Sequence, residues 1–240
     1  MQMRLNDRTI VIIGGTSGIG LSAAQACARS GANLVLVGRD EAKLADAAGA
    51  LGPGVRTVAG DAADPQTSRA AVHQAVQHFG RLDGWYHVAG GSGRNAGDGP
   101  LHEIVPEGWR YTVQANLDGL FHSNQAAVQQ FLDQGGGGSI LNMSSVLGFA
   151  PSARFFATHA YAATKAAAIG LTKACAAYYA PQNIRFNVIA PALVDTPMAK
   201  RAVGDPATLD YVRSRQPLEG GRAGVPEDLD EAAVFLLSDA

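Results

Sequence analysis

Tyr161 and Lys165 are the residues of this sequence whose types and spacing most directly suggest chemistry. They stand four residues apart in an alanine-rich stretch, Ala160 to Ala168, that is typical of a helix. This spacing places both side chains on one helix face, a single turn apart. A neighbouring ammonium favours phenolate, so we expect Lys165 to lower the tyrosine pKa from its usual value of about 10. Such a tyrosine could give or take a proton during hydride transfer to or from a carbonyl.

The elements that position this pair follow from a regular alternation along the chain. Short segments that are apolar almost throughout predict parallel strands covered on both faces, and longer helical patterns separate them. The predicted strands are Thr9–Ile13, Asn33–Val37, Val55–Ala59, Leu82–Val88, Ser139–Met143 and Ile184–Ile189. The predicted helices are Ile19–Ser30, Glu41–Leu51, Pro65–Phe79, Pro106–Gln134 and Tyr161–Ala180. The alternation predicts right-handed βαβ units in a doubly wound α/β fold.

The domain organisation is simple, with one interruption. We find no linker and no repeat beyond the strand–helix alternation, so we expect one domain over residues 1–240. Residues 193–224 interrupt the strand–helix alternation and are rich in Pro, Gly and mixed polar residues. We expect this stretch to form a lid over a ligand crevice.

The composition is typical of a compact globular protein and argues against several classes. Of 240 residues, 47% are hydrophobic and 17% charged, and 19 Lys and Arg are scattered against 21 Asp and Glu. We therefore expect no nucleic-acid partner. No apolar run approaches the ~20 residues that span a bilayer, so we expect no membrane association. Cys27 and Cys175 lack metal-ligand spacing, and we expect no metal and a reducing cytoplasmic location.

A glycine-rich loop directly follows the first predicted strand and precedes the first predicted helix. It reads Gly14-Gly15-Thr16-Ser17-Gly18-Ile19-Gly20. Glycines at these positions let the chain turn sharply and let the backbone approach a pyrophosphate. The N-terminus of the following helix offers unpaired N–H groups and the positive end of its dipole to phosphate. This context predicts a dinucleotide site.

The Gly-x-x-x-Gly-x-Gly spacing of this loop, together with Tyr161-x-x-x-Lys165, resembles the short-chain dehydrogenase/reductase family. The resemblance covers almost the whole chain and extends to the 3-oxoacyl-[acyl-carrier-protein] reductase-like members. It implies a Rossmann-type fold and a homo-oligomer, dimer or tetramer. The catalytic residues it implies are Asn116, Ser145, Tyr161 and Lys165.

The resemblance also implies a role for each catalytic residue. Tyr161 is the general acid and base, and Lys165 holds the cofactor ribose. Ser145 bonds the substrate oxygen, with Ser144 as the alternative. Asn116 supports a water path to the lysine, and we expect it to distort its helix locally, since asparagine competes for backbone hydrogen bonds.

A set of cofactor-binding residues follows from the same resemblance. Gly38 stands where NAD-binding relatives carry an acidic residue, and Arg39 follows it, so we favour NADP(H). Asp40 next to it keeps NAD(H) as the alternative. Asp61 matches an aspartate that contacts adenine, and Thr196 a threonine that bonds the nicotinamide carboxamide. The full set is Gly14, Thr16, Ser17, Gly18, Ile19, Gly20, Arg39, Asp61, Ala62, Ala89, Gly90, Tyr161, Lys165, Pro191, Val194 and Thr196.

The fourth predicted strand departs from the family pattern. It ends in His87-Val88-Ala89-Gly90, where relatives have two asparagines before the alanine and glycine. His87 could titrate near neutral pH, but we expect a packed, hydrogen-bonded strand residue. Ala192 is a second, milder replacement of a usual glycine.

Two segments differ in length from those of relatives. Tyr161 follows Ser145 by more residues than is usual, and the extra length lies in residues 149–159. Phe155 and Phe156 in this insertion could wall an apolar substrate pocket. The sequence also stops before the last strand of relatives, which leaves the sheet edge and the oligomer interface open.

These patterns predict an oxidoreductase that transfers hydride between NADP(H) and a small carbonyl compound or secondary alcohol. A ketone or a 3-oxoacyl compound is the expected substrate. One alternative is an NAD-dependent alcohol or sugar dehydrogenase on the same fold. Another is a non-catalytic nucleotide-binding regulator, for which the altered His87-Val88 segment is the main argument.

Overall fold

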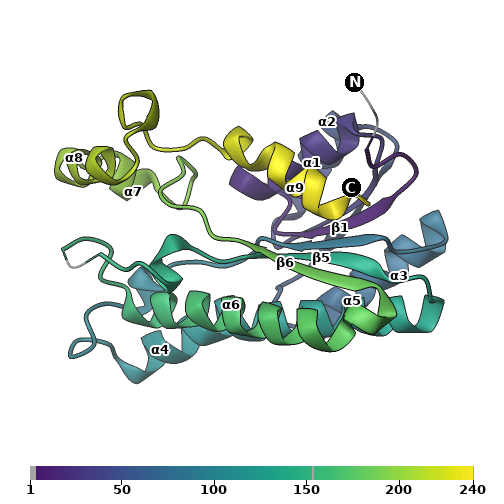
Figure 1. The fold of residues 1–240 in the computed structure, drawn as a ribbon, viewed down its shortest axis with the longest axis horizontal. Helices are drawn as coiled ribbons and strands as arrows, with labels where there is room; N and C mark the ends of the chain where they lie inside the picture. The colour runs from purple at the N-terminus through teal and green to yellow at the C-terminus, as the bar shows by residue number, and fades with distance from the viewer. Residues whose placement is uncertain (1–3, 153, 240) are drawn as a thin grey trace.

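Six parallel strands form the central sheet of the computed structural model, which describes residues 4–152 and 154–239 (Figure 1). The strands are β1 (Thr9–Ile13), β2 (Asn33–Gly38), β3 (Val55–Ala59), β4 (Gly84–His87), β5 (Gly138–Met143) and β6 (Ile184–Ile189). Their order is β3-β2-β1-β4-β5-β6. The strand order therefore reverses between β1 and β4, which defines the doubly wound, Rossmann-type fold that the sequence predicts.

Helices cover both faces of the sheet (Figure 1). One layer contains α1, α2 and α9, and the opposite layer contains α3, α5 and α6. The helices are α1 (Gly18–Arg29), α2 (Glu41–Leu51), α3 (Pro65–Phe79), α4 (Pro106–Val113), α5 (Gly119–Gln134), α6 (His159–Tyr179), α7 (Lys200–Val203), α8 (Pro206–Arg215) and α9 (Asp230–Leu237). In the described part of the chain, none of them combines the length and apolar character needed to cross a membrane.

Strand β1 shows why the apolar runs predict this architecture. Ile10 and Ile12 pack toward α1, α2 and α9, whereas Val11 and Ile13 pack toward α3 and α5. All four side chains are fully buried. Burying each contributes about 1.5–3 kcal/mol, which favours apolar residues at most positions of a strand between two helix layers.

Some predicted boundaries differ from those observed. Strand β4 begins at Gly84 rather than Leu82, because the Leu82 amide donates to the Gln134 side chain instead of a neighbouring strand. The predicted helix Pro106–Gln134 is divided into α4 and α5 by a π-helical turn, Gln114–Asp118.

Residues 193–224 leave the sheet after β6 and carry α7 and α8 away from it, at the upper left of Figure 1. The base of this excursion is closed by a bridge between Val194 and Gly224. The Asp195 amide donates to the Gly224 carbonyl at 2.8 Å, and the Gly224 amide donates to the Leu193 carbonyl at 2.9 Å. The two ends of this segment are therefore held next to each other.

Candidate active site

A cavity of about 410 Å³ lies at the carboxyl ends of the central strands. Its wall includes the last residue of β1, Ile13, and the last residue of β5, Met143. This is where the strand order reverses, the place at which doubly wound sheets bind ligands. Arg39 and Asp61 line the cavity, as do Tyr161 and Lys165.

The glycine-rich loop forms part of the cavity wall. Gly14, Thr16, Ser17, Gly18 and Ile19 all line it, whereas Gly20 packs behind them. Gly14 has a φ of 89°, and a Cβ there would lie 2.8 Å from the Ala89 backbone nitrogen. Any side chain at this position would separate the loop from β4, so glycine is required for the loop to close on the sheet.

Tyr161, Lys165 and Ser145 converge near the inner end of this cavity. The Lys165 Nζ donates to the Met143 carbonyl at 3.0 Å and lies 5.4 Å from the centroid of the Tyr161 ring. The Tyr161 hydroxyl and the Ser145 side chain share a hydrogen bond. All three residues are buried or nearly so. The Tyr161 phenol thus lies between the Ser145 hydroxyl and the Lys165 ammonium, and all three are shielded from water.

The electrostatics of this group differ from the sequence expectation in one respect. Burial raises the pKa of Tyr161, and its hydrogen bond with Ser145 lowers the pKa by less. Burial also lowers the pKa of Lys165, to about 8. The prediction that Lys165 brings the Tyr161 pKa below its usual value is therefore wrong for this structure. Desolvation disfavours the phenolate, and the ammonium lies over the ring and bonds a carbonyl.

Asn116 lies in the π-helical turn between α4 and α5, so the expected local distortion is present. Its Nδ2 donates to the Gly91 carbonyl at 2.8 Å and to the Thr112 carbonyl at 2.9 Å. Its Oδ1 accepts the Gly91 amide at 3.1 Å. A Cβ on Gly90 would lie 2.5 Å from Asn116 Oδ1 and 3.4 Å from Lys165 Nζ. The bare glycine thus lets the amide and the ammonium approach one another.

Two neighbouring residues hold the framework rather than face the cavity. The Ser144 hydroxyl donates to the Lys165 carbonyl at 2.7 Å and is buried, so the geometry favours Ser145 over Ser144 at Tyr161. His87 is fully buried and shares a 2.7 Å hydrogen bond with Ser123. Burial, and then the charge of Lys165, lowers the pKa of His87 to about 3. His87 is therefore the packed strand residue that the sequence predicts, and it does not titrate near neutral pH.

The remaining predicted cofactor residues divide into two groups. Those that line the cavity are Ala62, Ala89, Gly90 and Thr196, besides those already named. Pro191 and Val194 do not line it: the Pro191 carbonyl accepts the Val146 amide at 3.0 Å, and Val194 is buried in its bridge with Gly224. Asn116 and Ser145 are not among the lining residues, but each bonds one that is, Gly91 and Tyr161 respectively.

Among the residues that sequence reasoning missed, three hold the catalytic side chains in place. Gly91 bonds Asn116, the Met143 carbonyl holds Lys165, and the Asp98 carboxylate accepts the backbone amide of Tyr161. Gly91 and Met143 act through backbone atoms, which no side-chain motif reveals. Asp98-Gly99-Pro100 reads only as a turn. Within residues 4–152 and 154–239, no group of three or more His, Cys, Asp or Glu side chains is arranged to hold a metal.

The fold and the site together define a dinucleotide-dependent oxidoreductase. Comparison with known proteins identifies the family. Residues 14–240 match the family model described as enoyl-(acyl carrier protein) reductase. The chain is 36% identical to an L-rhamnose 1-dehydrogenase (NAD(P)(+)) of Azotobacter vinelandii, over 99% of this chain and 92% of that protein.

Solved structures agree. A short-chain type dehydrogenase/reductase from Mycobacterium ulcerans superposes with a TM-score of 0.89 at 32% identity, over 98% of this chain and 84% of that one. A 3-ketoacyl-(acyl-carrier-protein) reductase from Brucella melitensis, complexed with NADH, gives a TM-score of 0.85 at 28% identity, over 98% and 92% of the two chains. The chain belongs to the short-chain dehydrogenase/reductase family.

Proposed function

We propose that this protein is an NADP(H)-dependent oxidoreductase that interconverts a carbonyl group and a secondary alcohol through Tyr161. The observation that carries the proposal is the convergence of Tyr161, Ser145 and Lys165 at a cavity lined by the glycine-rich loop. This convergence joins a proton donor, a second hydroxyl and a cation at one place, as reduction of a carbonyl requires.

The residues present fit a nicotinamide dinucleotide. The bare Gly14 seats the loop on β4, and the cavity wall includes both Arg39 beyond β2 and Tyr161 on α6. When bound, the cofactor supplies or accepts the hydride. The glycine-rich loop and the N-terminus of α1 would hold its pyrophosphate, and Asp61 its adenosine half.

The protein's own residues then govern the oxygen and its proton. Ser145 and Tyr161 hold the substrate oxygen, and the Tyr161 hydroxyl donates its proton as negative charge develops there. A buried phenol with a raised pKa remains protonated and ready to donate. Lys165, held by the Met143 carbonyl, would bind the cofactor ribose, and the Asn116 turn supports the path by which the proton is restored.

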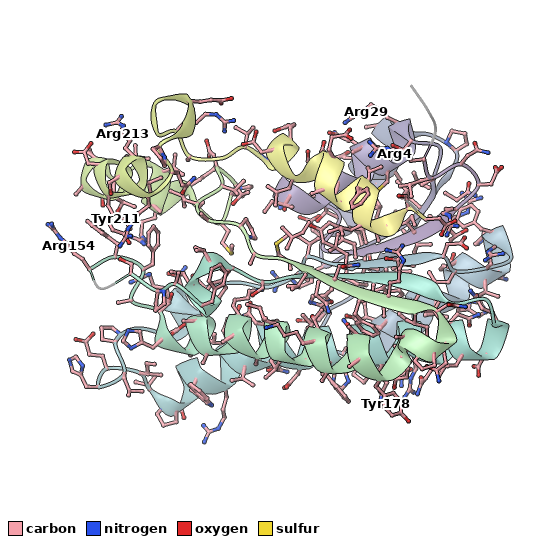
Figure 2. The ribbon with its side chains drawn as sticks, viewed as in Figure 1. Arg4, Arg29, Arg154, Tyr178, Tyr211 and Arg213 are labelled. Atoms are coloured by element: carbon pink, nitrogen blue, oxygen red, sulfur yellow. The ribbon has the colours of Figure 1, made fainter. Side chains whose placement is uncertain are left out.

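Replacing Tyr161 with Phe tests this role. Loss of the hydroxyl should lower kcat by about 10²–10⁴-fold, because general acid–base catalysis contributes that much, and should leave cofactor affinity within about twofold. Tyr178→Phe is the matched control, since this tyrosine lies on the same helix, is 72% exposed and points away from the body of the protein (Figure 2). Near-normal turnover of the Tyr161→Phe variant would show that the Tyr161 hydroxyl is not the proton donor.

The preference for NADP(H) rests on the end of β2. A Cβ on Gly38 would lie 2.7 Å from the Thr16 methyl group, so an acidic side chain fits there only if Thr16 moves. Asp40 is engaged elsewhere, since its carboxylate accepts the Lys43 amide at 3.1 Å and caps α2. Arg39 lines the cavity, is exposed, and has no ion pair or hydrogen bond with any described residue. Its guanidinium is free to pair with a 2′-phosphate.

The variant Arg39→Ala separates the two cofactors. Loss of a charge-assisted hydrogen bond should raise the Kd for NADPH about 10–100-fold and change the Kd for NADH by no more than twofold. Arg69→Ala on α3, which is also exposed, is the control. Equal weakening of both cofactors, measured by fluorescence titration, would contradict the assignment and favour NAD(H).

The substrate we propose is a ketone or a 3-oxoacyl compound. A second candidate is a sugar or other cyclic secondary alcohol, and the similarity to an L-rhamnose 1-dehydrogenase supports it. A panel of ketones, 3-oxoacyl thioesters and sugars, assayed in both directions with NADP(H) and NAD(H), discriminates the two by kcat/KM. A nucleotide-binding regulator would bind the cofactor and turn over none of them.

Two further expectations remain proposals. We propose a cytoplasmic location, consistent with two unpaired cysteines of which Cys27 is fully buried. We also propose a homo-oligomer, as is common in the family. Sedimentation velocity measures the second directly.

A further inference from the structure

The start of α6 is held by a short segment that follows β4, residues 98–101, which we name the capping segment. The first N–H groups of a helix lack partners within the helix. Here the His159 amide donates to the Gly99 carbonyl at 3.1 Å, and the Ala160 and Tyr161 amides donate to the two carboxylate oxygens of Asp98 at 3.0 and 2.9 Å. The next amide, that of Ala162, makes the first regular helical hydrogen bond, to the Thr158 carbonyl four residues earlier. The capping segment therefore satisfies the first three amides of α6, those of residues 159–161.

Asp98 is suited to this task by burial and charge. It is only 4% exposed, and among described residues its carboxylate has no cationic partner. A carboxylate at a helix N-terminus gains from the helix dipole and from charge-assisted hydrogen bonds, which are stronger than neutral ones. A side-chain cap supplied from 63 residues away is not part of local helix formation. It ties this turn of α6 to another part of the fold.

That other part is itself joined to the candidate site. The Asp98 amide donates to the Gly93 carbonyl at 3.1 Å across a tight turn. Two residues before Gly93, Gly91 exchanges two hydrogen bonds with the Asn116 side chain. One stretch of eight residues, 91–98, therefore contacts Asn116 at one end and the backbone of Tyr161 at the other. The same segment therefore helps to fix the positions of both Asn116 and Tyr161.

Tyr161 and Lys165 depend on this cap unequally. Tyr161 is the third residue of α6, inside the turn that Asp98 holds. Lys165 is one turn further on, where its own side chain bonds the Met143 carbonyl and its carbonyl accepts the Ser144 hydroxyl. Loss of the cap would loosen the turn that carries Tyr161 while Lys165 stays anchored.

We propose that Asp98 is a positioning residue, whose carboxylate fixes the first turn of α6 and so holds the Tyr161 hydroxyl against Ser145. The proposal rests on the proposed function, in which Tyr161 donates the proton. It predicts that removal of the carboxylate lowers kcat and leaves the Kd for NADPH unchanged. The glycine-rich loop and Lys165, which would hold the cofactor, do not depend on the cap.

The test compares Asp98→Ala and Asp98→Asn with a matched control, Asp83→Ala. Asp83 is also an almost fully buried aspartate that accepts a backbone amide, that of Thr9 at 2.9 Å, but it lies at the amino ends of the central strands β1 and β4. Three quantities are measured: hydrogen exchange of residues 158–162 by mass spectrometry, the Kd for NADPH, and kcat. The exchange measurement needs no substrate.

The expected result is faster exchange of residues 158–162 in Asp98→Ala, with kcat lowered about 10–100-fold and Kd for NADPH within twofold. Asp98→Asn keeps one acceptor oxygen and should lose less kcat than Asp98→Ala. Asp83→Ala should leave exchange at this segment and kcat unchanged, even if its melting temperature falls. If Asp98→Ala does not fold, Asp98→Asn decides alone, with a kcat loss of at least threefold at unchanged Kd in support.

The proposal is overturned if the folded Asp98 variants keep wild-type kcat and exchange. It is also overturned if they lose kcat and cofactor affinity together, or if Asp83→Ala behaves in the same way. A wild-type protein without turnover on any substrate would refute the proposed function instead. The exchange of residues 158–162 would still decide, on its own, whether Asp98 holds that turn.

Discussion

His87 illustrates at the residue scale how this fold changes the chemistry of a side chain. In water an imidazole titrates near pH 6.5. Here the ring is fully buried, bonded to Ser123, and near the charge of Lys165, and its pKa falls to about 3. Between pH 6.5 and pH 3 the unfolded chain therefore binds a proton at this histidine that the folded chain does not bind.

The sign of the resulting pH dependence follows from that difference. The stabilising contribution of neutral His87 is fully present above pH 6.5 and is lost progressively as the pH falls toward 3. We predict that His87→Asn shows a smaller drop in the free energy of unfolding between pH 7 and pH 4.5 than the wild type, by up to about 1.4 kcal/mol per pH unit. Urea unfolding at both pH values measures it. His78→Asn, an exposed control, should retain the wild-type slope, and equal slopes in all three proteins would contradict the assignment.

At the residue scale, the sequence predicts which side chains come together but not how far folding removes water from them, and this loss of water shifts their pKa values. The spacing of Tyr161 and Lys165 correctly predicts one helix face, because helical periodicity is local. The sign of the Tyr161 pKa shift is wrong, because it depends on how much water the folded protein removes from the hydroxyl. Ser144 and Ser145 are equivalent in sequence and are separated only by what each hydroxyl contacts.

At the scale of elements, the loop of residues 149–159 meets the excursion of residues 193–224. Phe155 of the loop packs against Tyr211 of α8 with ring centroids 5.0 Å apart. The Ser152 side chain shares a hydrogen bond with the Tyr211 hydroxyl. Figure 2 shows Tyr211 pointing from α8 toward the loop that carries Arg154. Two segments that the sequence marks separately as candidates for substrate choice thus form one contact beside the start of α6.

Breaking this contact should affect the substrate more than the cofactor. An aromatic pair contributes about 0.5–1.5 kcal/mol beyond its buried area, so we predict that Tyr211→Ala raises KM for the carbonyl substrate about 2–10-fold. The Kd for NADPH should stay within twofold, because Tyr211 does not line the cavity of about 410 Å³. Steady-state kinetics with Tyr178→Ala as control measure this. An unchanged KM would show that the contact does not bear on substrate binding.

Elements defined by local signals are predicted from the sequence, and those defined by distant contacts are not. The strands β1, β3 and β6 begin and end as expected. The helices α2 and α3 do so too, since Asp40 and Asp64 cap them from adjacent positions. The start of α6 is misplaced by two residues, because its amides are satisfied by the capping segment far back in the chain. The sequence predicts a local distortion at Asn116 but not the π-helical turn that divides α4 from α5, where the Asn116 side chain reaches across to Gly91.

At the scale of the whole molecule, the cofactor cavity exists only when the chain is folded. Its lining residues run from Ile13 to Met198 and come from strands and helices on both faces of the sheet. An unfolded chain cannot assemble this surface. A ligand that binds here binds the native state alone and stabilises it by mass action, by about 2.7 kcal/mol at a free concentration of 100 times Kd.

Two glycines in different helices test this linkage. For a chain of this length we predict that NADPH at 100 times Kd raises the melting temperature by about 5–10 °C. Gly49 lies on the exposed side of α2, with nothing within 4 Å of an added Cβ, so Gly49→Ala should raise the melting temperature by about 2–4 °C and keep the NADPH shift.

The first turn of α1 should respond in the opposite way. A Cβ on Gly20 would collide with the Gly14 carbonyl oxygen, so Gly20→Ala forces the glycine-rich loop to move. We predict a lower melting temperature and little or no NADPH shift, because the displaced loop no longer fits the pyrophosphate. Differential scanning calorimetry with and without NADPH measures both quantities. A full NADPH shift in Gly20→Ala would mean that the cofactor does not bind against this loop, since backbone that has moved cannot present the same amides to the same ligand.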